Sequence, residues 1–165
     1  MAGILVAYAT KYGSTAEIAR AVGETIANKG MEVDVVRARK VKDVRPYGLV
    51  VLGTPVFMGK PMKEAVRFAE KFRDGLRERK VALFSVGIQM REDTPENRTE
   101  AAKVLAPIVA FTGTPETIGL FAGSIDQKRF GFFLRMFAKM EKTGLLNGGD
   151  WRDWDVIREW AGGLV

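Results

Sequence analysis

Apolar residues along the chain gather in five short runs that alternate with longer amphipathic segments. The runs at 4–9 and 47–53 are apolar enough for strands buried on both faces of a sheet, and they are too short to span a membrane. The run at 31–36 alternates and is rich in β-branched residues. We predict strands at 4–9, 31–36, 47–53, 80–86 and 117–121.

Helical spacing appears between these strands. Ile18, Ala19, Val22 and Ile26 form one apolar stripe behind a capping-box sequence, 14–17. Pro61 suits the first turn of a second helix, and Thr94-Pro95 begins a third, which Pro107 bends or ends. The predicted helices are 16–30, 61–76, 95–110, 126–143 and 153–162.

Strands that alternate with helices imply βαβ units with right-handed crossovers and a mostly parallel sheet covered on both faces. We therefore predict an α/β protein whose 165 residues form one three-layer domain, 1–165. The five parallel strands are expected in the order 2-1-3-4-5, and a helical insertion at about 123–149 follows strand 5.

The amino-acid composition excludes several classes of catalytic and metal-binding site. The chain contains neither Cys nor His, which excludes thiolate nucleophiles, imidazole bases, Ser-His hydrolases and most zinc sites. No metal site is expected, no residue stands out as a catalytic acid or base, and redox chemistry requires a bound cofactor. The net charge of +6 predicts a basic surface, but the cations follow no nucleic-acid-reading motif.

Three loops follow strands 1, 3 and 4, so they meet at one edge of the predicted sheet. The first joins a strand to a helix through hydroxyl side chains and Gly13, an arrangement suited to holding a phosphate at the helix N-terminus. An alternative is that Ser14 merely caps the helix. The candidate ligand-binding residues of this loop are Thr10, Lys11, Tyr12, Gly13, Ser14 and Thr15, with Lys11 peripheral.

The pattern Thr-x-x-Gly-x-Thr after an apolar first strand resembles the FMN phosphate loop of flavodoxins. It lacks the Gly-Lys-Ser/Thr ending of a Walker loop, the extra glycines of a dinucleotide fingerprint and the acidic pair of receiver domains. The resemblance implies that the second loop flanks the isoalloxazine ring, although an ordinary strand-to-helix turn would look similar. Its residues are Thr54, Pro55, Val56, Phe57, Met58 and Gly59.

The third loop lies where flavodoxins cover the other face of the ring. Its candidate residues are Ser85, Val86, Gly87 and Ile88. The loop departs from ordinary flavodoxins because it offers no Tyr or Trp for stacking, so Ile88 or Met90 takes that place or the face is open to substrate. The basic charge is a second departure, since short-chain flavodoxins are usually acidic.

The segment 123–146 resembles an insertion found in the flavodoxin-type, quinone-linked protoporphyrinogen oxidase family. Phe130, Phe133, Leu134 and Phe137 recur at helical spacing beside a basic face, and an Asp-Trp segment begins the last helix. One interpretation is that the stripe packs on the domain and the basic face is solvated. The other is that the helix, over 126–142, forms a peripheral contact with a membrane, where quinone is found, or with a partner, and both can hold together.

The resemblance implies an FMN oxidoreductase that passes electrons from a porphyrinogen or similar donor to a quinone or protein acceptor. A non-enzymatic electron carrier for an acidic protein is the alternative, and a domain that has lost FMN is a third possibility. The start of the chain predicts a strand and no signal peptide, so we expect a cytoplasmic protein, with the inner membrane face as a second location.

Overall fold

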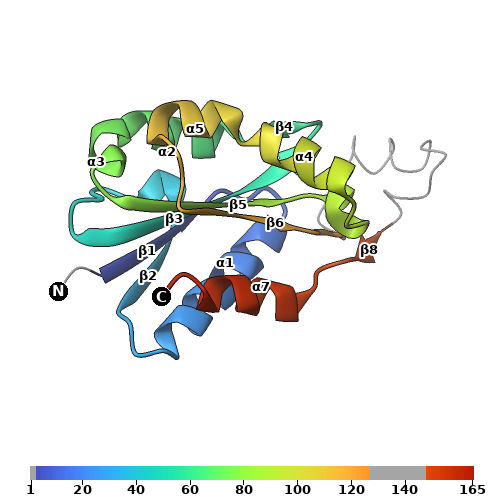
Figure 1. Cartoon of the computed structure of the whole chain (residues 1–165), viewed down its shortest axis with the longest axis horizontal. Helices are drawn as coiled ribbons and strands as arrows, with labels where there is room; N and C mark the ends of the chain where they lie inside the picture. The colour runs from blue at the N-terminus through green and yellow to red at the C-terminus, as the bar shows by residue number, and fades with distance from the viewer. Residues whose placement is uncertain (1–2, 127–147) are drawn as a thin grey trace.

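The computed structural model describes residues 3–126 and 148–165. A parallel sheet runs through the middle of these residues in the order β2-β1-β3-β5-β6 (Figure 1). A short strand, β4, pairs antiparallel with the end of β3. If the strands are numbered without β4, then β5 and β6 become the fourth and fifth strands. The parallel strands then follow the predicted order 2-1-3-4-5, which confirms the fold class. The strands are β1 Gly3–Tyr8, β2 Val33–Arg37, β3 Tyr47–Phe57, β4 Lys60–Pro61, β5 Lys80–Val86 and β6 Thr117–Phe121.

Helices cover both faces of the sheet, as right-handed crossovers require (Figure 1). One face carries α2 Lys63–Lys71, α3 Arg73–Arg77, α4 Pro95–Val104 and α5 Ala106–Thr112. The opposite face carries α1 Ser14–Ala27 and α7 Trp154–Gly162, which pack against each other. Two short 3-10 helices, η1 Ala38–Lys40 and η2 Ile88–Arg91, follow β2 and β5.

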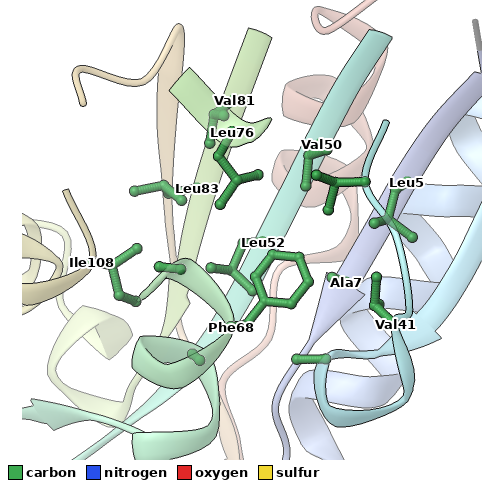
Figure 2. Packing of buried hydrophobic residues seen from close by; sticks show 14 of the residues in the cluster. Leu5, Ala7, Val41, Val50, Leu52, Phe68, Leu76, Val81, Leu83 and Ile108 are labelled. Atoms are coloured by element: carbon green, nitrogen blue, oxygen red, sulfur yellow. The ribbon is translucent and has the colours of Figure 1, made fainter. Parts of the chain in front are cut away.

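The apolar runs form two cores because neighbouring residues of a strand point to opposite faces. Leu5 and Ala7 of β1 and Val50 and Leu52 of β3 belong to the core beneath α2, α3 and α5 (Figure 2). Their neighbours in sequence, including Ile4 and Val51, belong to the core beneath α1 and α7. The sheet is therefore packed on both sides, which explains its nearly continuous apolar runs.

Several predicted helix details change. The helix predicted from Pro61 to residue 76 is two helices, and Pro61 lies in β4 instead of a first helical turn. The prediction for 95–110 also becomes two helices, which meet at Leu105 because Pro107 lies in the first turn of the second, as expected for a bend at this proline. The cap at Thr94 is confirmed, since its Oγ1 accepts a hydrogen bond of 3.1 Å from Asn97 N.

The base of the insertion is a small antiparallel ladder. Strands β7 Ser124–Ile125 and β8 Gly149–Asp150 pair with each other, and Trp151 N donates to Gly123 O at 3.1 Å. The predicted helix 126–143 lies outside the described residues apart from Asp126. In the described part of the chain, no helix is long and apolar enough to cross a membrane.

Candidate functional site

The three loops predicted to bind a ligand meet at the carboxyl edge of the sheet. They follow β1, β3 and β5, which are neighbours in the sheet order. Ala9 N, at the start of the first loop, donates to Gly53 O of β3 at 3.0 Å. Gly87 packs against the second loop so closely that an added Cβ would lie 3.2 Å from Val56 Cβ. The three segments are thus in contact along one edge.

The first loop ends in a left-handed glycine at the start of α1. Gly13 has φ 98° and serves as the N-cap, so no side chain occupies the helix end. Thr10 Oγ1 accepts a hydrogen bond of 3.0 Å from Gly13 N and closes the turn. The capping-box interpretation of Ser14 is wrong because Ser14 is already the first helical residue. The first-turn amides remain directed at the loop, where an anion would be stabilised.

Arg37, a residue that the sequence analysis did not assign to the site, holds the first loop from the end of β2. Its Nη2 donates to Thr10 O at 3.0 Å and to Glu64 Oε1 of α2 at 3.2 Å. Both partners of this ion pair are largely buried, with side-chain exposures of 26% and 14%. Arg37 therefore ties the loop to the helix on the other side of the site. Arg37 ends β2, and the carboxyl end of β2 lies at the same edge of the sheet as the three loops. This position could have indicated from the sequence that Arg37 lies near the site.

Replacement of Arg37 by Met is expected to lower the free energy of unfolding by about 1–3 kcal/mol, because it leaves the partly buried Glu64 without its cation. Urea denaturation measures the loss. The matched control is Arg39→Met: the Arg39 side chain is exposed and has no ion pair with any described residue. A change of equal size in both variants would contradict this role for Arg37.

The second loop is a β-hairpin, whereas the prediction was a loop from the third strand to a helix that begins at Pro61. β3 continues to Phe57, Met58 and Gly59 form a two-residue turn, and Phe57 pairs with Lys60 of β4. Both turn residues have positive φ, 52° and 73°, as a type I′ hairpin requires. Met58 is an unusual residue in this conformation and its side chain is 87% exposed.

Thr54 stabilises this hairpin internally. Its side chain is fully buried, with Oγ1 accepting from Met62 N and donating to Pro55 O, each at 3.0 Å. In the third segment, Ser85 and Val86 are buried in β5, beside Thr54 and Pro55 of β3. Gly87 N donates to Phe121 O at 3.0 Å, and Ile88 begins η2. The exposed candidates for contact with a ring are therefore at the hairpin tip.

Lys11 joins the first loop to the hairpin. Its Nζ lies 4.6 Å from the centre of the Phe57 ring and 5.5 Å from the centre of the Tyr12 ring. Such cation–aromatic contacts are weak at exposed sites but directional. Lys11, predicted to be peripheral, thus places a positive charge between two parts of the candidate site.

The base of the insertion contacts the first loop on the opposite side. Ser124 Oγ lies 3.3 Å from Ser14 Oγ. Arg152, which follows β8, pairs with Asp150 and also with Glu17 in the first turn of α1. The hydrogen bond from Arg152 holds the pKa of Asp150 below its ordinary value and raises the pKa of the guanidinium. Arg152 was not among the predicted site residues, although it lies in the Asp-Trp segment that precedes the last helix.

Among the described residues, open hollows also lie away from the three loops. One of about 280 Å³ lies between α1 and α7 and includes Arg20 and Trp154, and one of about 390 Å³ lies beside α7 and Thr117. Neither is lined by the second or third loop, so we do not identify either with the ligand site. Among the described residues, no cluster of three acidic side chains could hold a metal ion.

The strand order agrees with comparisons to known proteins. The Flavodoxin domain family matches residues 5–144, which include all three loops. The chain belongs to the flavodoxin domain family. Among solved structures, the flavodoxin of Streptococcus pneumonia TIGR4 has a TM-score of 0.61 and 17% identity, with 97% of this chain and 95% of that chain covered. The two-electron reduced flavodoxin of Megasphaera elsdenii has a TM-score of 0.57 and 19% identity, with 71% and 84% covered.

A curated relative has a more specific name. Protoporphyrinogen IX dehydrogenase [quinone] of Escherichia coli (strain K12) is 22% identical over 170 residues, which cover 95% of this chain and 91% of the relative. This alignment extends over the insertion as well as the sheet. With the family match, it supports a flavodoxin-type redox protein with a flavin cofactor.

The residues present fit such a cofactor. A glycine-capped helix end beside the hydroxyl of Ser14 supplies neutral donors for a phosphate, and Lys11 adds a cation nearby. The hairpin supplies a partly exposed aromatic ring, Phe57, as a wall for a flat ligand, whereas Met58 projects from the hairpin tip and is 87% exposed. The donor set is thus chemically suited to a flavin that carries a phosphate.

Proposed function

We propose that this chain is a single-domain FMN oxidoreductase that accepts electrons from a porphyrinogen or a similar reduced donor and passes them to a quinone. The observation that carries the proposal is the glycine-capped start of α1, together with a relative named protoporphyrinogen IX dehydrogenase [quinone] that aligns over nearly the whole chain. Bound FMN would supply the redox chemistry, which the side chains of a chain without Cys or His cannot.

In this proposal each of the three loops contacts a different part of the flavin. The first-turn amides of α1 and the hydroxyls of Ser14 and Thr15 hold the phosphate, while Thr10 and Arg37 fix the loop that presents them. Phe57 would line one side of the ring, and Gly87 and Ile88 would line the opposite edge. Backbone groups of Val56 and Gly59 would bond the polar ring edge. No side chain is assigned as acid or base.

The test is anaerobic turnover by the FMN-loaded protein. We expect porphyrinogen oxidation that depends on added quinone and stops when the flavin is removed. Absorbance of the porphyrin product follows the reaction. Absence of turnover, with electron exchange to protein acceptors intact, would contradict the enzyme proposal.

That second result would favour a non-enzymatic electron carrier for an acidic protein, for which the flavodoxin fold and the net charge of +6 are the supporting observations. Transfer to an acidic partner should slow as salt concentration rises, because screening weakens the attraction between exposed charges. Salt-insensitive transfer would count against the carrier.

A further inference from the structure

The positive charge of the chain is concentrated in two stretches. Residues 37–80 contain thirteen Lys and Arg but five Asp and Glu, a net charge of +8, and residues 127–147 contain five Lys and Arg but one Glu, a net charge of +4. Because the whole chain carries +6, the remaining residues are acidic in sum, and the first stretch holds the larger excess. The stretch from 60 onward forms β4, α2 and α3, so much of the excess lies on one helical layer, next to the candidate flavin site.

Helix α2 presents this charge as a stripe. Lys63, Arg67 and Lys71 are spaced four residues apart and all are exposed, so they share one face of the helix. Lys60 of β4 extends the stripe toward the hairpin tip. We call these four residues the basic face. Helix α2 has two carboxylates: Glu64 pairs with Arg37, whereas the exposed Glu70 lies seven residues after Lys63 and shares its face. The basic face thus carries four cations and one carboxylate, and within the described residues Lys60, Lys63 and Arg67 form no ion pair.

An apolar projection stands beside the basic face. Met58 occupies the tip of the hairpin two residues before Lys60, is 87% exposed, and adopts a positive φ of 52° that few residues other than glycine favour. Phe57 is 42% exposed beside it. A peripheral membrane contact requires an apolar group that inserts between lipids and cations that attract anionic headgroups. The flexible Met58 side chain can supply the first and the basic face the second.

We propose that the basic face docks on an anionic lipid bilayer, with Met58 entering the headgroup region. We favour a bilayer over an acidic protein because a convex, single-residue tip would need a complementary pocket on a protein, whereas lipid headgroups can rearrange around it. The choice also rests on the proposed function, since a quinone acceptor dissolves in the bilayer. Docking in this orientation would bring the hairpin side of the flavin site to the membrane surface.

Vesicle co-sedimentation of the FMN-loaded full chain tests the proposal. The probes are phosphatidylcholine vesicles and vesicles with about one part phosphatidylglycerol to two parts phosphatidylcholine. We expect binding to the anionic vesicles alone, weakening as salt rises. Lys63→Glu with Arg67→Glu should reduce binding at least about tenfold, since each cation near an anionic surface contributes about a fivefold factor. Met58→Ser should reduce it by about fivefold.

The matched control is Arg20→Glu with Arg158→Glu, which makes the same change in net charge on the opposite layer, at exposed positions of α1 and α7. This variant should keep most of the binding. Equal losses in the two double variants, or failure of the unmodified protein to bind anionic vesicles, would overturn the proposal. A third outcome would also overturn the proposal: the α2 variant binds normally, while Arg135→Glu with Lys139→Glu loses binding. That outcome would place the membrane contact in segment 126–142.

A water-soluble quinone separates this inference from the proposed function. Reduction of that quinone without vesicle binding would refute the docking proposal alone. Vesicle binding that depends on α2 without quinone reduction would refute the enzyme proposal alone. If the chain ignores anionic vesicles and the α2 cations instead control salt-dependent electron transfer to an acidic protein, the basic face serves a protein and the membrane proposal is wrong.

Discussion

Loss of the hydroxyls of Ser14 and Thr15 should weaken FMN binding by about 3 kcal/mol, roughly a hundredfold in Kd, because each hydrogen bond to a charged group contributes about 1.5–3 kcal/mol. The variant is Ser14→Ala with Thr15→Val, where Val preserves the shape of a side chain that is 1% exposed. Fluorescence titration with FMN and with riboflavin measures the effect. Riboflavin, which lacks the phosphate, should bind both proteins almost equally.

Thr25→Val is the control for this experiment. Thr25 lies in the same helix, where its hydroxyl donates to Ala21 O at 2.8 Å, but it is remote from the N-terminus of α1. The control should retain FMN affinity. Unchanged FMN affinity in the Ser14/Thr15 variant would exclude the first loop as the phosphate site, whatever the protein does with the flavin.

Gly53→Ala should lower the free energy of unfolding by about 3 kcal/mol, the upper end of the usual cost of overpacking a core. A Cβ at position 53 would lie 2.0 Å from Phe84 Cζ. Phe84 is fully buried and its ring centre lies 5.8 Å and 6.0 Å from those of Phe121 and Trp160, so the ring has little room to move. Urea denaturation followed by circular dichroism measures the loss.

Two variants make this result interpretable. Gly3→Ala, also in a strand, places its Cβ at an ordinary 3.5 Å from Glu32 O and should be far less destabilising. Phe84→Leu should offset part of the Gly53→Ala cost, so the double variant is more stable than the sum of the single effects implies. Equal destabilisation by the two glycine variants, with no such coupling, would show that the ring contact is not the cause.

The strand order could be predicted because its signals are local. Apolar runs at 4–9 and 47–53 must be covered on both faces, and the parallel arrangement then follows from the alternation with helices. The predicted cap at Thr94 follows a local side-chain rule and forms, and Asp153, predicted as the first residue of the last helix, is the N-cap of α7. The position of the three loops on one edge follows from the same topology.

Other features depend on contacts between distant segments. The sequence around Pro61 is compatible with a helix start, but pairing of 60–61 with the end of β3 makes it a hairpin strand. Ser14 satisfies a capping-box pattern, yet Gly13 takes the cap position because the turn needs a left-handed residue there. Both partners of Arg37 lie 27 residues away, and Glu17, the second partner of Arg152 beside its neighbour Asp150, lies 135 residues away, so no local pattern indicates these contacts.

The most direct measurement is the visible absorption spectrum of the purified protein, with mass spectrometry of the chromophore that it releases. Our account predicts flavin absorption bands and the mass of FMN, either as purified or after reconstitution with FMN. A colourless protein that cannot be reconstituted, or a chromophore other than FMN, would contradict the account.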